Sequence, residues 1–498
     1  MSSFDKIQAR EQGLSKALTS RQISMIALGG AIGTGLFLGS KFAISYAGPS
    51  VIISYAIGAV VALLLMAALA EMTIQHPTSG SFGAYAEHYI GPMAGFLVRI
   101  SYWSCIVLAV GTEVTAIGTY MKFWLPDVPG LVWIICFSAA LIGVNMFNVH
   151  AFGTLEFWLS SIKVFAIIAF IIMAAVAVFG NFSPDFGFHN YTADGGFMPN
   201  GIWGTWIAVI VSIFSYLSIE MIAVAAGEAE DPETATKSAF RTVILRLFLF
   251  YICTLALIVA IAPMHEILEG GSPFVTVMSV LGIPFADSIL NFVVIIAALS
   301  AMNSQLYTST RMAFSLARGG DAPAFIGRVA KNGAPVNALV LSAIGIAIAT
   351  IVYVINPEQA FVVMMAISMF GAMFTWMMIF VSHIFFRRSL AKQGIPVKYK
   401  LPFYPVGTYV GVFLMAAILL TTAFTDSSFN MTLVFGSPFL AVVSVWYWLR
   451  VRPRKLAESA AERAAESAAE STAEAAAERL SPSKTSTPRR RRKVAPEL

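Results

Sequence analysis

The sequence contains few charged side chains. Lysine, arginine, aspartate and glutamate make up 12% of its 498 residues, whereas about a quarter of the residues in an ordinary soluble domain are charged. Hydrophobic residues make up 58%, and the charges gather between long apolar runs. This pattern excludes a large soluble domain and predicts a protein that crosses the membrane many times.

Cysteine and histidine are also scarce. The three cysteines, Cys105, Cys136 and Cys253, lie in apolar runs, and the six histidines show no spacing typical of metal ligands. We therefore expect no disulfide framework, no metal and no cofactor. The glycines between residues 28 and 40 neither follow a strand nor precede a phosphate-loop lysine, so they do not predict a nucleotide site. No nucleophile–base set indicates an enzyme.

The apolar runs predict an all-helical membrane protein with about twelve transmembrane helices. A helix needs about 20 mostly apolar residues to cross the hydrocarbon core. The predicted spans lie near residues 22–44, 49–70, 95–123, 131–149, 156–179, 202–226, 242–262, 285–312, 336–355, 359–385, 405–424 and 431–449.

Lysine and arginine occur in alternate connecting segments. They are present in residues 1–21 and after spans six, eight, ten and twelve, but they are missing from residues 180–201, 263–284 and 424–430. Cytoplasmic loops of membrane proteins carry the excess of basic residues. Both termini are therefore predicted to be cytoplasmic, and we read the net charge of +5 through topology rather than as a sign of a nucleic-acid partner.

Three regions are expected along the chain. Residues 1–21 form a cytoplasmic N-terminus, residues 22–450 form the transmembrane domain, and residues 451–498 form a cytoplasmic tail. The tail is rich in alanine and glutamate, is predicted to be disordered and ends with a basic cluster, Arg489 to Lys493. It is either simply solvated or in contact with anionic lipid head groups, which attract such clusters.

The first span contains an unusual stretch, LGGAIGTGLFLGS, with five glycines between Leu28 and Ser40. Each glycine costs a helix interior roughly 1 kcal/mol relative to alanine. Two explanations are open: the glycines let a neighbouring helix approach closely, or they mark a point where the helix unwinds and exposes its backbone to a cavity.

The sixth span favours the second explanation. The stretch VSIFSYLSIEMIAVAAGEAEDP places several serines, a tyrosine and Glu220 near the middle of an apolar segment. An acidic residue at a helix centre costs about 2.5–3.5 kcal/mol on insertion scales, so it normally faces a cavity or a partner. Two interrupted segments at matching positions in two halves are typical of a transporter binding site.

With these motifs, the sequence resembles a known family, the bacterial amino-acid permeases of the amino acid–polyamine–organocation superfamily. The resemblance covers about residues 18–450, nearly everything except the tail. It rests on the motifs GGAIGTGLF, AGPSVIISY, GSFGAYAEHYIGPMAGF, LEFWLSSIKV, GEAEDP and ALSAMNSQLYTSTRM, which occur in this order. One position departs from the pattern: the family usually has a glycine in the interruption of span six, where this chain has Ser218.

The resemblance implies a core of two five-helix repeats of opposite orientation, as in the LeuT-like fold. The first repeat covers about residues 22–180 and the second about 202–385, and two extra helices follow at about 405–450. It also implies a multi-pass protein of the plasma membrane, the bacterial inner membrane, whose small-molecule partners are an amino acid and a proton.

By the same resemblance, the two interrupted stretches bind the substrate. The backbone N–H groups of Thr34 and Gly35, beside Gly33, are expected to hold its carboxylate. The carbonyl oxygens of Ala31, Phe214 and Leu217 are expected to receive its ammonium group. The full set of candidate binding residues is Ala31, Ile32, Gly33, Thr34, Gly35, Glu113, Phe214, Ser215, Leu217 and Ser218.

Lys163 lies well inside span five. It either reaches the membrane surface with its long side chain or stays buried and exchanges a proton, because burial disfavours its charged form. The resemblance adds that sodium-coupled relatives keep a cation at the equivalent place, where a lysine ammonium would couple transport to protons instead.

Other polar residues in the spans have two open interpretations. Glu113 in span three either makes interhelical hydrogen bonds or faces the substrate side chain and joins proton movement. Glu220 either steadies the interrupted segment or relays a proton. Asn303 and Ser304 in span eight are expected to hydrogen-bond within the core, and His383 in span ten is expected to lie at the membrane interface.

The sequence thus predicts a secondary transporter that imports an amino acid across the plasma membrane by proton symport with alternating access. A proton-independent amino-acid exchanger is the alternative, and Lys163 discriminates between the two. A membrane sensor that binds an amino acid without moving it is a third hypothesis, which the short and simple tail does not favour.

Overall fold

The computed structural model describes most of the chain. It covers Phe4 and residues 32–78, 80–147, 149–221, 223, 232–330, 334–400, 403–425, 428–457, 459–461, 464 and 467–468. The structure divides into two units, residues 1–444 and 445–498, which are described separately.

Within these residues the regular structure is helical throughout, with no strand. The α-helices of residues 32–261 are α3 (Thr34–Phe37), α4 (Gly39–Ala47), α5 (Val51–Gln75), α6 (Ser81–Tyr89), α7 (Pro92–Met121), α8 (Gly130–Phe147), α9 (Val149–Phe179), α10 (Gly201–Tyr216), α12 (Pro232–Arg246) and α13 (Thr254–Ile261). The later α-helices are α14 (Met264–Glu269), α15 (Pro273–Val280), α16 (Ala286–Arg318), α17 (Val336–Ser342), α18 (Ile344–Ile355), α19 (Ala360–Gln393), α20 (Val406–Thr421) and α21 (Met431–Trp446). The π-helical segment Leu247–Cys253 joins α12 to α13, and a second one, Tyr447–Val451, lies in the second unit.

These helices confirm the predicted all-helical membrane architecture. Nine helical stretches in the described residues are long and apolar enough to span a membrane, and two shorter apolar helices, Gly130–Met146 and Gly201–Tyr216, fall where spans four and six are expected. The first stretch, Thr34–Gln75, covers the described part of span one and all of span two. These two spans follow one another directly because the 3-10 turn Gly48–Ser50 links α4 to α5.

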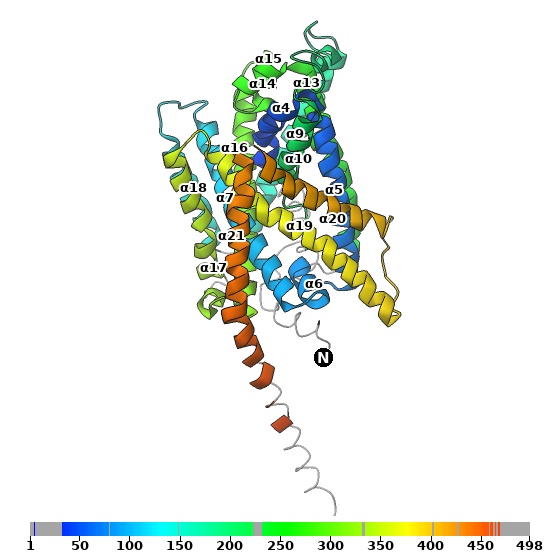
Figure 1. Ribbon diagram of the computed structural model, residues 1–498. Helices are drawn as coiled ribbons and strands as arrows, with labels where there is room; N and C mark the ends of the chain where they lie inside the picture. Colours follow the sequence, from blue (N-terminus) through cyan, green and yellow to red (C-terminus); the bar gives the residue numbers. More distant parts are fainter. Residues whose placement is uncertain are drawn as a thin grey trace, which may run out of the picture. The chain divides into compact units, whose positions relative to one another are not determined.

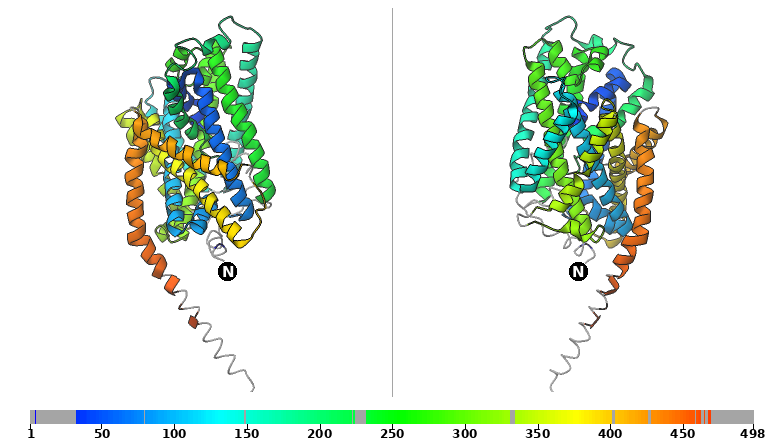
Figure 2. Two further views of the ribbon diagram at one scale, coloured as in Figure 1. Left: turned by 45° about the vertical axis from the view of Figure 1, so that its right-hand side comes forward. Right: turned by 90° about the vertical axis from the view of Figure 1, so that its left-hand side faces the viewer.

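The first unit is organised around α7. This helix packs against α16, α18 and α19, while α10 packs against α4 and α5. Figures 1 and 2 show the arrangement, with α14 and α15 at one end of the bundle and α6 toward the other. The helices α7 and α16, which are the third spans of the two expected repeats, pack together.

Close approach of helices explains at least one of the many glycines. A Cβ atom added to Gly111 in α7 would lie 2.7 Å from the carbonyl oxygen of Gly345 in α18. Small residues at such crossings let two backbones approach, which is how helices gain packing energy in a lipid environment.

The structure corrects the interpretation of His383. Its side chain is fully buried, not interfacial. Its Nε2 atom lies 2.7 Å from Oε2 of Glu71 in α5, and its Nδ1 atom lies 3.0 Å from the hydroxyl of Thr408 in α20. Arg387, one helical turn further along α19, donates to Oε1 of Glu71 at 2.7 Å. The hydropathy of span ten does not reveal that His383 is buried, because its carboxylate partner, Glu71, lies on a different helix.

We predict that Glu71→Ala destabilises the protein strongly. The substitution removes the carboxylate that both His383 and Arg387 face, and loss of one partner from a buried ion pair costs about 3–5 kcal/mol. Thermal unfolding of the purified protein in detergent, followed by tryptophan fluorescence, should show a clearly lower Tm.

Glu233→Ala is the matched control. Its carboxylate pairs with Lys237 at 2.6 Å, but these side chains are 51% and 45% exposed. Such a pair contributes about 0.5 kcal/mol or less, so its Tm should stay near that of the wild type. Equal losses in the two variants would contradict the structural role of Glu71.

Candidate functional site

Helix α10 is interrupted where the sequence indicates. The helix ends at Tyr216, and Leu217 follows with an extended conformation (φ −55°, ψ 147°). Ser218 then adopts a positive φ of 80°, a region that favours glycine because it has no Cβ atom. Ser218 therefore has the backbone conformation for which the family usually uses glycine, and the chain keeps the break without that residue.

The structure describes span one from Ile32 onward, so only the side of the expected break that leads into α3 is described. Gly33 is extended (φ −128°, ψ −162°), and α3 begins at Thr34. Leu38, between α3 and α4, has helical angles (φ −106°, ψ −41°), so α3 and α4 form one nearly continuous helical segment that ends at Ala47. Ala31, a predicted binding residue, lies outside the described residues.

The two interrupted helices touch at Gly35. The hydroxyl of Ser215 donates to the Gly35 carbonyl oxygen at 2.7 Å. A Cβ atom on Gly35 would lie 2.9 Å from the Cα atom of Ser215 and 3.1 Å from the Cδ1 atom of Phe214. The glycine at position 35 is thus required by a backbone contact, and Phe214 lies directly beside the start of α3.

Glu113 of α7 reaches the start of α3. Its Oε2 atom accepts a hydrogen bond from the Thr34 N–H at 3.1 Å. Its Oε1 atom lies 2.7 Å from the position that a Cβ on Gly33 would occupy. The side chain is only 3% exposed. A buried carboxylate therefore satisfies a backbone donor that the interruption leaves without a helical partner.

Lys163 of α9 is fully buried and faces the same interruption. Its Nζ atom donates to the Ile32 carbonyl oxygen at 3.0 Å and to the Ser300 hydroxyl at 2.8 Å. Of the two interpretations left open by the sequence, the structure favours a buried lysine over one that reaches the membrane surface. The ammonium group ties α9 and α16 to the backbone at the break.

Glu156 is not among the site residues that the sequence predicts, yet it belongs to this network. Its carboxylate accepts hydrogen bonds from Ser300 at 2.5 Å and from Asn303 at 3.2 Å, and the same Ser300 hydroxyl accepts the hydrogen bond of Lys163. Glu156 and Lys163 are seven positions apart, close to two helical turns. This spacing places them on one face of α9 and is the signal that could have linked them.

Glu220 lies at the other interruption. It accepts hydrogen bonds from the Tyr102 hydroxyl at 2.7 Å, from the Trp376 indole N–H at 3.1 Å and from the backbone N–H of Ser218 at 3.2 Å. These contacts hold the segment after the break to α7 and α19. The geometry favours the steadying role among the two that the sequence left open.

The predicted residues thus form two adjoining groups. The first group surrounds the start of α3 and consists of Ile32, Gly33, Thr34, Gly35, Glu113, Lys163, Phe214 and Ser215. The second group lies at the end of α10 and consists of Leu217, Ser218 and Glu220. Asn303 joins the first group through Glu156. The hydroxyls of Ser218 and Ser304 are buried and have no hydrogen-bond partner among the residues that the structure describes.

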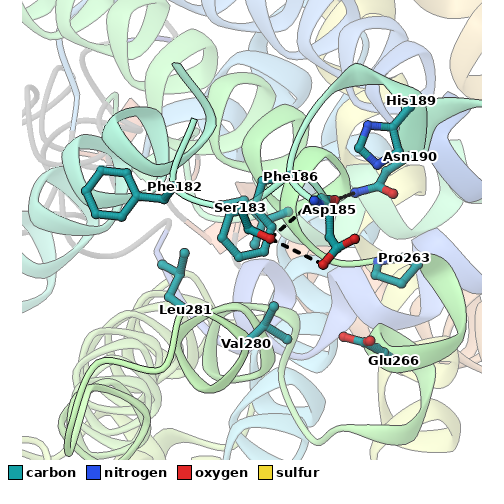
Figure 3. Close-up of a pocket in the computed structure, with 11 residues that line it drawn as sticks. Phe182, Ser183, Asp185, Phe186, His189, Asn190, Pro263, Glu266, Val280 and Leu281 are labelled. Carbon is teal, nitrogen blue, oxygen red and sulfur yellow. Dashed lines mark hydrogen bonds between the residues drawn. The ribbon is translucent and has the colours of Figure 1, made fainter. Parts of the chain in front are cut away.

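A separate pocket of about 580 Å³ lies away from the interruptions, between residues 182–190, the end of α13 and α15 (Figure 3). Its lining includes Asp185, Glu266, Phe182 and Phe186. It shares no residue with the interrupted helices, so it is not part of the candidate site.

Polar groups of both signs lie around the described sides of the two breaks. The Thr34 N–H meets Glu113, the Gly35 carbonyl oxygen meets Ser215 near the end of α10, and the Ile32 carbonyl oxygen meets Lys163. Comparison with known proteins decides the family: the sequence pattern described as amino acid permease matches residues 22–458. The chain belongs to the amino acid permease family.

Individual relatives agree with this assignment. The uncharacterized amino acid permease YtnA of Bacillus subtilis (strain 168) is 39% identical over 445 residues, which cover 89% of this chain and 96% of the relative. The aromatic amino acid transport protein AroP of Escherichia coli (strain K12) is 36% identical over 453 residues, covering 91% and 99%. AroP of Salmonella typhimurium (strain LT2) is 38% identical over 423 residues, covering 85% and 92%. This permease is therefore a multi-pass membrane protein of an amino-acid transport family.

We predict that Gly35→Ala damages both stability and transport in this permease. The added Cβ would meet backbone atoms of Ser215, which cannot move aside as a flexible side chain could, and such overpacking typically costs about 1–3 kcal/mol. Thermal unfolding should show a lower Tm, and uptake of radiolabelled amino acid into cells should fall.

Gly143→Ala is the matched control, because a Cβ there would meet nothing within 4 Å. Alanine is the better helix former, so this variant should keep or slightly raise the Tm. A harmless Gly35→Ala would mean that α3 and α10 do not cross as described.

Proposed function

We propose that this permease imports a neutral amino acid together with a proton, and that the substrate binds at the interruptions of span one and α10. The membership in the amino acid permease family supports transport of an amino acid. The position of Lys163 is the observation that carries the proposal of proton coupling.

The substrate would be held by main-chain atoms. The N–H groups of Thr34 and Gly35 stand at the start of the helical segment formed by α3 and α4, where the helix dipole favours negative charge. This arrangement suits the substrate carboxylate. The carbonyl oxygens of Phe214 and Leu217, with that of Ala31, would receive the ammonium group. Backbone atoms supply both partial charges without placing further full charges in the membrane.

Lys163 would couple the proton to the change of conformation. In its charged form the ammonium group donates to the Ile32 carbonyl oxygen and keeps α9 attached to the break. Loss of the proton removes a donor and the positive charge, which weakens this attachment. A side chain that holds two segments together when it is protonated and releases them when it is neutral is a suitable switch for alternating access.

Aromatic amino acids are the first substrates to test. Relatives that match almost the whole chain carry the name aromatic amino acid transport protein. The buried Phe214 side chain beside the start of α3 suits contact with an apolar or aromatic substrate side chain, since aromatic rings gain energy from packing against one another.

The alternative is an amino-acid exchanger that does not need a proton. Lys163 separates the two mechanisms, because an exchanger would work without a group that takes up and releases a proton. A membrane sensor remains the third hypothesis, and net uptake would rule it out.

We predict that Lys163→Gln loses proton-driven accumulation. Purified protein is reconstituted into liposomes with an imposed inward proton gradient, and radiolabelled L-phenylalanine, L-tyrosine, L-tryptophan and L-alanine are offered in turn. The wild type should concentrate at least one of them. The variant should fail to concentrate it but should still exchange labelled for unlabelled substrate, since the backbone site is intact.

Lys237→Gln serves as the control, because its lysine is half exposed, pairs with Glu233 on the same helix and lies over the Tyr399 ring. Undiminished accumulation by Lys163→Gln would refute proton coupling through this lysine. Accumulation by the wild type that ignores the proton gradient would favour the exchanger.

A further inference from the structure

We propose that Glu113 is an internal substitute for the substrate carboxylate, and that the substrate binds only when Glu113 takes up a proton and leaves the start of α3. This inference rests on the proposed function. It assigns to Glu113 a positioning role in substrate exchange, distinct from that of a ligand for the substrate's ammonium group or side chain.

The first argument is that the two carboxylates need the same place. Glu113 already accepts the Thr34 N–H at 3.1 Å, and this N–H is one of the two donors proposed for the substrate carboxylate. The Oε1 atom of Glu113 lies against Gly33, 2.7 Å from where a Cβ would stand. A substrate that approaches the backbone here meets the Glu113 carboxylate first, so binding requires its departure.

The second argument concerns charge. The groups that face the Glu113 carboxylate are Lys163 from α9, Thr34 from α3, Gln305 from α16 and, on its own helix, Tyr120. Lys163 is the only cation in this set. Lys163 already shares the Ser300 hydroxyl with the Glu156 carboxylate. Two further carboxylates that compete for the Thr34 N–H would repel each other strongly, because little solvent screens them in a buried site.

A proton resolves this conflict. If Glu113 is neutral when the substrate enters, only one carboxylate group stands at the start of α3 both before and after binding, and the substrate's ammonium group goes to the carbonyl oxygens. The neutral Glu113 also binds the Thr34 N–H less strongly, since hydrogen bonds to an ionised acceptor are roughly twice as strong as neutral ones. One proton is therefore taken up for each substrate bound.

The test is Glu113→Gln, which keeps the shape of the side chain and removes its charge. Binding of L-phenylalanine and L-alanine to purified protein is measured between pH 5.5 and 7.5. Wild-type affinity should fall toward tenfold per pH unit where Glu113 loses its proton, the slope that linkage gives for one proton. Affinity of the variant should lose the pH dependence that Glu113 contributes and, at pH 7.5, should be about five to ten times higher than that of the wild type.

The opposite result is equally clear. A loss of affinity of tenfold or more in Glu113→Gln would make Glu113 a ligand of the substrate and overturn the proposal. A variant that keeps the wild-type pH slope would also overturn it, because the proton would then enter elsewhere. Glu269→Gln, on an exposed residue at the end of α14, should behave as the wild type.

A measurement on the unaltered protein guards against a variant that does not fold. Calorimetric titration of the wild type in two buffers of different ionisation enthalpy should show uptake of one proton for each amino acid bound, and uptake of none would overturn the proposal. A wild type that binds no amino acid would instead refute the proposed function. A wild type that binds with no proton uptake leaves that function standing and refutes only the role of Glu113.

Discussion

A helix that is interrupted inside a membrane leaves backbone N–H and C=O groups that water cannot reach, and each must find a partner in the protein. This requirement shapes the centre of the permease. Side chains from other parts of the protein or from the adjoining segment meet the backbone groups beside the two breaks. The pairs are Glu113 with the Thr34 N–H, Lys163 with the Ile32 carbonyl, Ser215 with the Gly35 carbonyl, and Glu220 with the Ser218 N–H.

The same requirement explains why ionisable residues lie in the middle of the bundle. A charge there is expensive unless it is paired or hydrogen-bonded. Lys163 and Glu113 both reach the break in span one, while Ser300 and Asn303 of α16 bind the carboxylate of Glu156. Groups that stabilise the break are thus also the groups able to change their charge beside it. Under the proposed function, structural support and proton exchange would depend on the same few atoms.

The rest of the first unit provides a framework for these breaks. The central helix α7 carries Glu113 and Tyr102, and it packs on α16, α18 and α19, with close approach allowed by small residues such as Gly111. The buried cluster of Glu71, His383 and Arg387 joins α5 to α19. Because α19 also supplies Trp376 to Glu220, the framework and the break in α10 share a helix.

The helical membrane architecture, the helix start after Gly33, the end of α10 before Ser218 and the family can all be predicted from the sequence alone. Each of these follows from local features: apolar runs of the length of a bilayer, clustered glycines, and polar residues inside an apolar segment. Only the tertiary structure decided that Glu113 meets Thr34, that Lys163 meets Ile32, that Glu156 joins them and that His383 is buried. Thr34 and Glu113 are 79 positions apart, Ile32 and Lys163 are 131 apart, and Glu71 and His383 are 312 apart. The packing of distant helices selects such partners, and no local pattern encodes it.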